Sequence, residues 1–381
     1  MNMDAGRLPS ARGGPGLPWL YDIRRMEKQP MHRMFAFLAG LFLIASPMAA
    51  DVRAAETGAL KIVACWNIAC TSTAIAPTVA AAREVGFNGL IWCSKRQDLI
   101  PPECHRQGLR CFRVIEPLHK RPGARLQMLA PGEETLPGAV PVDADSRYQY
   151  GGEPVAGRQE VLDRELVCPC DPSIVPFVRE EVVKARAAGF DGVCWDCIGY
   201  RNYRSCACNT CRAALDRRRR ERPGETEAQA RDASAGTALE ELYARLYETT
   251  KGVDTNLTVL SHCYPVFLPD VYGGARYRLD YCMMTVSWFF QPHWPLEKVR
   301  DATRRCVQGP YVDPRTVGMP MIGFYSTGVL ARHRRDGARL RAELEILVQT
   351  HARAVEYCEL GDILADPEAR AALREGLLRL R

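Results

Sequence analysis

Three cysteines lie within six residues in the stretch SCACNTC, at Cys206, Cys208 and Cys211. This C-x-C-x2-C spacing brings three thiolates close enough to bind one tetrahedral metal ion, for which zinc is the usual choice. Four thiolates close the coordination shell, so we expect a structural zinc site rather than a catalytic one. The candidates for the fourth ligand are Cys168, Cys170 and Cys197.

Disulfides are the alternative for this cluster if the chain is exported to an oxidising compartment. The two cysteines of a C-x-C pair have poor geometry for bonding to each other, so any disulfide needs partners from elsewhere in the chain. Other cysteines of the chain, which has 16 in all, lie inside apolar runs, where a cysteine acts as a small core residue. The chain has only seven histidines and no H-x-H motif, which argues against a catalytic histidine metal centre.

Eight short apolar runs alternate with helical segments from residue 59 onward. Continuous apolar runs are typical of parallel strands that are buried on both faces. The stretches AREVGFNGLIWC (82–93) and ARAAGFDGVCWD (185–196) repeat the pattern of a helix end, a turn and a strand. The runs span residues 60–66, 89–94, 110–116, 192–196, 257–263, 281–289, 319–325 and 354–359.

Repeated helix-to-strand units and eight strands predict an α/β fold, a (β/α)8 TIM barrel, with long loops after strands 3 and 4. The first loop covers the Pro-rich residues 117–170, and the second begins at residue 197 and holds the three cysteines. An open, doubly wound sheet is the alternative. No G-x-G-x-x-G motif follows the first strand, which weakens the dinucleotide-binding form of that alternative.

The carboxyl ends of the strands form the active-site face of such a barrel. Asp196 ends the fourth run and is the first catalytic candidate, as nucleophile or base, and Glu116 and Glu359 are the candidates for a second carboxylate. Aromatic rings at a pocket mouth can stack on sugar rings, and His and Tyr side chains can bind hydroxyl groups. The candidates for substrate binding are Trp66, Trp92, Tyr200, His262, Trp288 and Tyr325.

The stretches CPCDPSIVPFVREEV, GFDGVCWD and CACNTC together resemble glycoside hydrolase barrels of the family 42 β-galactosidase kind. They resemble even more the uncharacterised bacterial glycosyl-hydrolase-like barrels, whose DG-x3-D strand is matched by Asp191, Gly192 and Asp196. The first resemblance implies that Cys168 joins the C-x-C-x2-C cysteines in binding zinc. The second implies hydrolysis of a glycosidic bond, for which two carboxyl groups are usually needed.

The sequence also departs from the family 42 pattern. That pattern has an Asn-Glu pair at the end of strand 4 and a glutamate at the end of strand 7. Here Trp195 and Asp196 end the fourth run, and the seventh run ends in GFYST without a carboxylate. A glycoside hydrolase is therefore the main hypothesis, and a non-catalytic carbohydrate-binding barrel is the alternative.

The first 55 residues are typical of an export signal. Four basic residues (Arg24, Arg25, Lys28 and Arg33) lie just before the apolar run MFAFLAGLFLIA (34–45), and small residues follow that run. The run has 12 residues, too few to span a bilayer. We therefore expect a secreted or periplasmic protein with an N-terminal extension (1–55) and one barrel domain (56–381), free of the membrane after cleavage.

Composition narrows the partners further. The net charge of +6 on 381 residues is too modest for a nucleic-acid-binding protein, and a hydrophobic content of 47% is ordinary for a globular one. We expect a carbohydrate partner, a structural zinc ion and no organic cofactor. The sequence does not specify the oligomeric state.

Overall fold

The computed structural model describes the backbone of residues 63–67 and the residues 74–92, 99–131, 165–202, 204–263, 276–287, 293–308, 313–323, 335–358 and 360–380. All of them belong to one compact unit, Ala55–Arg381. The proposed export signal lies outside the described residues. Among the described helices, none is both long and apolar enough to cross a bilayer.

The described strands are parallel and pair in chain order, and the last strand pairs back with the first, so the sheet closes into a barrel. Each strand overlaps one of the eight apolar runs of the sequence. The strands are β1 (Val63–Asn67), β2 (Gly89–Trp92), β3 (Arg110–Ile115), β4 (Gly192–Trp195), β5 (Thr258–Cys263), β6 (Tyr281–Thr285), β7 (Val317–Gly323) and β8 (Val355–Cys358).

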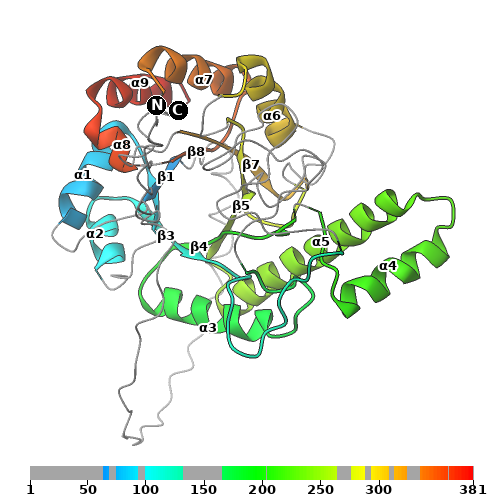
Figure 1. Cartoon of the computed structure of the whole chain (residues 1–381). Helices are drawn as coiled ribbons and strands as arrows, with labels where there is room; N and C mark the ends of the chain where they lie inside the picture. The colour runs from blue at the N-terminus through cyan, green and yellow to red at the C-terminus, as the bar shows by residue number, and fades with distance from the viewer. Residues whose placement is uncertain are drawn as a thin grey trace, which may run out of the picture. The chain divides into compact units, whose positions relative to one another are not determined.

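Helices follow the strands and surround the sheet (Figure 1). The prediction of an α/β fold built from parallel strands and helices is confirmed. Helices α4 and α5 pack together as a pair that extends away from the strands (Figure 1). The helices are α1 (Ile75–Val85), α2 (Ile100–Arg106), α3 (Ile174–Ala187), α4 (Asn209–Glu221), α5 (Glu227–Val253), α6 (Leu296–Gln308), α7 (Gly337–Gln349), α8 (Leu360–Ala365) and α9 (Pro367–Leu380).

The repeated sequence pattern corresponds to equivalent positions in the fold. Its two copies end in β2 and β4, each of which starts at a glycine, Gly89 and Gly192. A Cβ atom at Gly192 would collide with the backbone of Thr258, the first residue of β5. A glycine is therefore required where β4 enters the sheet, because the neighbouring strand passes too close for any side chain.

Aspartates brace the amino ends of two strand pairs in the same way. Asp191 precedes β4, and its Oδ2 accepts a hydrogen bond from the Cys111 N–H of β3 at 2.8 Å. Asp280 precedes β6, and its Oδ2 accepts one from the Val259 N–H of β5, also at 2.8 Å. Each carboxylate thus satisfies a backbone donor that the sheet ladder leaves free at the strand entrance.

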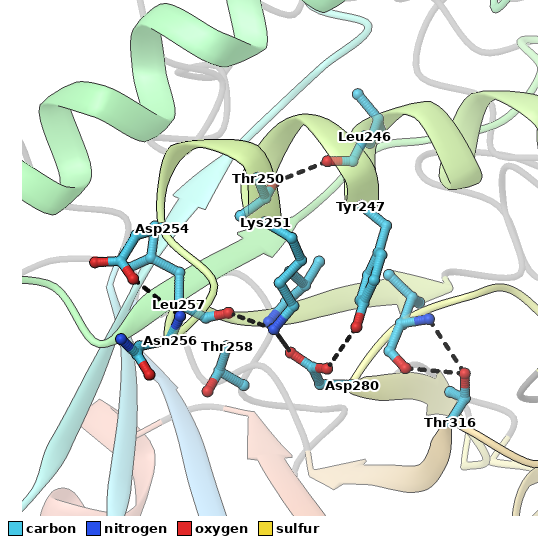
Figure 2. Close-up of polar contacts among 12 residues, drawn as sticks. Leu246, Tyr247, Thr250, Lys251, Asp254, Asn256, Leu257, Thr258, Asp280 and Thr316 are labelled. Carbon is cyan, nitrogen blue, oxygen red and sulfur yellow. Dashed lines mark hydrogen bonds and ion pairs between the residues drawn. The ribbon is translucent and has the colours of Figure 1, made fainter. Parts of the chain in front are cut away.

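Side chains from the preceding helices complete both braces. His105 of α2 lies 3.0 Å from Asp191 Oδ2. Lys251 of α5 donates to Asp280 Oδ2 at 2.7 Å, and Tyr247, one turn earlier, donates to Asp280 Oδ1 at 3.2 Å (Figure 2). The Lys251 ammonium also donates to the Leu257 carbonyl oxygen at 2.7 Å, which fixes the end of α5 against the start of β5.

The connections after β3 and β4 are only partly described. Residues 132–164 of the segment between β3 and α3 lie outside the described residues. The two described ends of this segment meet in isolated antiparallel bridges, His119 with Leu166 and Leu126 with Val167. The chain therefore returns beside its own starting point before α3 begins.

Candidate active site

Four polar side chains gather at the carboxyl ends of four neighbouring strands. Glu116 follows β3, Asp196 follows β4, His262 lies near the end of β5, and Thr285 ends β6. These strands are adjacent in the barrel, so their ends form one continuous edge. This edge is the one at which enzymes with parallel barrels carry their catalytic groups.

Two of the three predicted catalytic carboxylates meet here. One oxygen of Glu116 and one of Asp196 lie within 4.8 Å of each other, together with the Cys197 sulfur. The Asp196 side chain is 15% exposed and the Glu116 side chain 33%. Both carboxyl groups are therefore close enough to act on one bond, and both retain access to solvent.

Asp196 lies against a buried histidine. His262 Nδ1 is 3.3 Å from Asp196 Oδ1, and His262 Nε2 is 3.0 Å from the Thr285 hydroxyl oxygen. His262 is 6% exposed and Thr285 1%. The imidazole thus connects a partly exposed carboxylate to a buried hydroxyl group.

Glu116 has different neighbours. The Cys197 thiol lies 3.8 Å from Glu116 Oε1, and His119 Nδ1 lies 3.6 Å from Glu116 Oε2. Cys197 has φ 56°, a left-handed conformation that is rare for a residue with a side chain. Such backbone strain is frequent at functional sites, and here it lies at the residue that directly follows Asp196 and contacts Glu116.

Two of the predicted aromatic binding residues are buried. Trp92 is 2% exposed and Tyr200 1%. The Tyr200 hydroxyl donates to the Ala235 carbonyl oxygen of α5 at 3.0 Å, so this group is used within the protein. In this structure both side chains are part of the core, and neither presents a face on which a sugar could stack.

The structure also revises the end of the sixth run. β6 ends at Thr285, although the apolar sequence continues to residue 289. Thr285 therefore occupies the strand end that the sequence assigned to Trp288. Glu359, Trp288, Tyr325 and the side chain of Trp66 lie outside the described residues.

The four predicted zinc ligands come together in a second cluster. The sulfurs of Cys168, Cys206, Cys208 and Cys211 all lie within 4.8 Å of one another, and no described cysteine forms a disulfide. The Cys168 sulfur is 3.7 Å from that of Cys208 and 3.5 Å from that of Cys211. Tetrahedral zinc with Zn–S bonds of about 2.3 Å requires sulfurs about 3.8 Å apart, so this donor set could hold the ion.

Backbone N–H groups near the Cys206 sulfur and the shifted pKa values of the thiols are both compatible with a bound cation. The N–H groups of Met128 and Cys208 point at the Cys206 sulfur at 3.4 and 3.5 Å. Hydrogen bonds from Cys168 and then Cys211 lower the pKa of the nearby Cys170 thiol to about 4. Burial raises the pKa of Cys208. Protons are therefore shared unequally among these thiols, and a cation would be needed to keep four of them ionised.

The cluster joins two separate connections. Cys168 lies just before α3, and Cys206, Cys208 and Cys211 lie between β4 and the first turn of α4. The Ala207 N–H also donates to the Met128 carbonyl oxygen at 2.8 Å. The site therefore holds the segment that leaves Asp196 against the segment that leaves Glu116.

The sequence pattern indicates neither the role of Thr285 nor the contact of Cys197 with Glu116. Thr285 lies in the middle of a long apolar run, where a threonine is an ordinary strand residue. The sequence indicates Cys197 only as a candidate for the fourth zinc ligand. Its place directly after Asp196 was visible in the sequence, but its left-handed backbone was not.

Neither a protein-family model nor a curated protein sequence matches the chain. Solved structures do match. The PgaB (BpsB) glycoside hydrolase domain from Bordetella bronchiseptica is 12% identical, with a TM-score of 0.54 over 83% of this chain and 98% of that domain. The fold is that of glycoside hydrolase barrels.

Two β-galactosidases are also similar in structure. The enzyme from the Antarctic haloarchaeon Halorubrum lacusprofundi is 11% identical with a TM-score of 0.55. The enzyme from the psychrophilic Marinomonas ef1 is 11% identical with a TM-score of 0.50. Each match covers 83% of this chain and spans 57% and 59% of the length of those enzymes, respectively.

Proposed function

We propose that this chain is a glycoside hydrolase with a (β/α)8 barrel, in which Asp196 and Glu116 cleave a glycosidic bond with retention of configuration. The observation that carries the proposal is the approach of the two carboxylate oxygens to within 4.8 Å at the carboxyl edge of the sheet. Retaining enzymes separate their carboxyl groups by about 5–5.5 Å and inverting enzymes by about 6.5–9.5 Å.

Asp196 is the better nucleophile of the pair. It is the less exposed carboxylate, and contact with His262 restricts its movement. In the first step an Asp196 oxygen bonds to the anomeric carbon, the glycosidic C–O bond breaks, and Glu116 gives its proton to the leaving oxygen. In the second step Glu116 takes a proton from water, and the water oxygen displaces Asp196 from the anomeric carbon.

Glu116 suits the role of acid and base. Its greater exposure lets it exchange protons with water between the two steps. One of its carboxylate oxygens also lies within 4.8 Å of one of Asp196, so both groups can reach the same glycosidic bond. Glu359 is the other predicted partner and lies outside the described residues.

We assign zinc as a structural ion bound by Cys168, Cys206, Cys208 and Cys211. Its chemistry would be limited to fixing loop positions, because four thiolates leave no open coordination position. The residues that this site ties together lead directly to Asp196 and Glu116. Export to the periplasm or the medium, directed by the apolar run at residues 34–45, would bring the enzyme to a carbohydrate substrate.

Hydrolysis of a panel of oligosaccharides and polysaccharides, followed by new reducing ends, tests the proposal. The full chain is compared with the double variant Asp196→Asn, Glu116→Gln, which shows any contaminating activity. We expect turnover by the wild type alone, and proton NMR of the first product should show the anomer of the substrate. An inverted anomer would overturn the retaining mechanism. Binding of sugars without any turnover would favour the carbohydrate-binding barrel.

A further inference from the structure

A buried chain of three side chains leads to Asp196 and is a distinct feature of this edge. The Thr285 hydroxyl oxygen lies 3.0 Å from His262 Nε2, and His262 Nδ1 lies 3.3 Å from Asp196 Oδ1. The three residues come from β6, β5 and the end of β4. The exposed fraction increases across these three residues, from 1% at Thr285 and 6% at His262 to 15% for the Asp196 side chain.

The chemistry of the three groups fixes the direction of the hydrogen bonds. An ionised carboxylate can only accept, so the His262 nitrogen that faces Asp196 must carry a hydrogen. In a neutral imidazole the other nitrogen is then an acceptor. The Thr285 hydroxyl can donate to this nitrogen at 3.0 Å, which is closer than its alternative acceptor, the Met321 sulfur at 3.8 Å. Asp196 therefore selects the tautomer in which Nδ1–H points at the carboxylate, and the Thr285 hydroxyl supports it by donating to Nε2.

The order hydroxyl, imidazole, carboxylate is also that of a Ser-His-Asp triad, in which the hydroxyl is the nucleophile. Burial excludes that use here. Thr285 is the most buried of the three residues, with 1% exposure, so a substrate cannot reach its hydroxyl oxygen. Asp196 is the member that faces solvent and the second carboxylate.

We propose that His262 is a positioning residue that holds Asp196 for attack, and that Thr285 supports the Nδ1–H tautomer by donating to Nε2. This inference rests on the proposed function only for its kinetic consequence. It replaces the expectation that His262 binds substrate hydroxyl groups. Because a misplacement of about 1 Å can cost about 100-fold in rate, a fixed carboxylate is worth a dedicated partner.

Two conservative variants distinguish the contributions of the two ring nitrogens of His262. In His262→Asn the side-chain amide occupies the place of Nδ1 and can still donate to Asp196. In His262→Gln the amide occupies the place of Nε2 and keeps only the contact with Thr285. We expect His262→Gln to lower kcat roughly 10- to 100-fold with little change in KM, and His262→Asn to recover most of that loss. Equal losses in both variants, or a loss in KM alone, would overturn the positioning role.

A spectroscopic measurement tests the tautomer independently of activity. Proton–nitrogen NMR of the full chain with labelled histidine, at about pH 8 where free imidazole is neutral, assigns the hydrogen of His262 to one nitrogen. We expect it on Nδ1, and we expect Thr285→Val to shift the Nε2 resonance. A hydrogen on Nε2, or an Nε2 resonance unchanged in Thr285→Val, would overturn the proposal. If the wild type hydrolyses no substrate while the Nδ1–H tautomer is found, the proposed function fails and the His262 arrangement stands.

Discussion

The two aspartates that flank β4 have opposite surroundings. Asp191, at the amino end, accepts hydrogen bonds from a backbone N–H of β3 at 2.8 Å and faces His105 at 3.0 Å. Asp196, at the carboxyl end, lies within 4.8 Å of a second carboxylate and contacts a buried histidine. The comparison teaches that the same residue type, five positions apart in DGVCWD, binds the sheet backbone at one end of the strand and lies beside a second carboxylate at the other.

Asp280 shows that the amino-end arrangement is a repeated structural device. Its carboxylate accepts from the Val259 N–H of β5. It also accepts from Lys251 and Tyr247 of α5 (Figure 2). Every one of these partners is a donor, which stabilises the charged carboxylate. At the carboxyl end, by contrast, a Glu116 oxygen lies within 4.8 Å of an Asp196 oxygen, an arrangement typical of catalytic carboxylate pairs.

Loss of the second carboxylate at the active edge should have a large effect. We expect Glu116→Gln to lower kcat by about 10²- to 10⁴-fold, because proton transfer to the leaving group is lost. The control is Glu181→Gln in α3. This variant removes a carboxylate that pairs with Arg113 of β3, the strand that Glu116 follows. Steady-state rates that stay normal in Glu116→Gln would remove this residue from the mechanism.

Removal of the metal should destabilise the carboxyl-end loops. We expect one zinc per chain by elemental analysis and its loss in Cys208→Ser. At a free zinc concentration about 1,000 times the Kd, loss of binding lowers the free energy of unfolding by about 4 kcal/mol. Cys306→Ser, at a buried cysteine in α6, should keep the zinc. Wild-type protein without zinc, with disulfides among these four cysteines, would contradict the assignment.

The amino-end brace should affect stability and leave catalysis intact. We expect Asp280→Asn to lower the free energy of unfolding by about 1–3 kcal/mol, because the Lys251 ammonium and the Val259 N–H lose a charged acceptor. Denaturant titration measures this change. The kcat below the melting temperature should equal that of the wild type. A fall of tenfold or more would contradict the claim that the amino ends of the strands contribute to stability and not to catalysis.

A smaller change at Asp280 measures how much one of its hydrogen bonds contributes to the free energy of unfolding. Tyr247→Phe removes the one hydroxyl that donates to Asp280 Oδ1 at 3.2 Å and leaves the ring in place. We expect a loss of about 0.5–1.5 kcal/mol in denaturant titration. In the double variant with Asp280→Asn the two losses should sum to less than their separate values, whereas full additivity would show that the hydroxyl acts elsewhere.

The smallest effect should be a change in acid stability. Hydrogen bonds from Arg186 and then Asn256 lower the pKa of Asp254 in the folded chain. A lowered folded pKa stabilises the protein above the unfolded value of about 3.9, and this stabilisation is lost as the pH falls through the folded pKa. Asp254→Asn should therefore flatten the fall in melting temperature below about pH 4. An unchanged acid profile would contradict this contribution.

Much of the architecture could be predicted from the sequence because it depends on local patterns. Apolar runs that start at Gly89 and Gly192 could be recognised as strands, and their ends placed Asp196 and Glu116 at one edge. The cysteine spacing predicted three members of the thiol cluster, and the family resemblance supplied Cys168. Parallel pairing brought these separate segments together without further information.

The remainder depends on packing that no local pattern reports. Trp92 and Tyr200 end or follow strands as exposed aromatic residues would, yet both are buried. β6 stops at Thr285 inside an apolar run, so the partner of His262 could not be identified. The roles of the two aspartates in DGVCWD likewise depend on which strand end each occupies and on which groups approach from neighbouring strands.

A side-by-side comparison of Asp196→Asn with Asp191→Asn, by kcat on the best substrate and by thermal unfolding, tests the central claim most directly. We expect Asp196→Asn to keep the wild-type melting temperature and to lose about 10³-fold or more in kcat. Asp191→Asn should keep its kcat at low temperature and unfold more easily, by about 1–3 kcal/mol. An active Asp196→Asn enzyme, or an Asp191→Asn enzyme that is folded but inactive, would contradict the account.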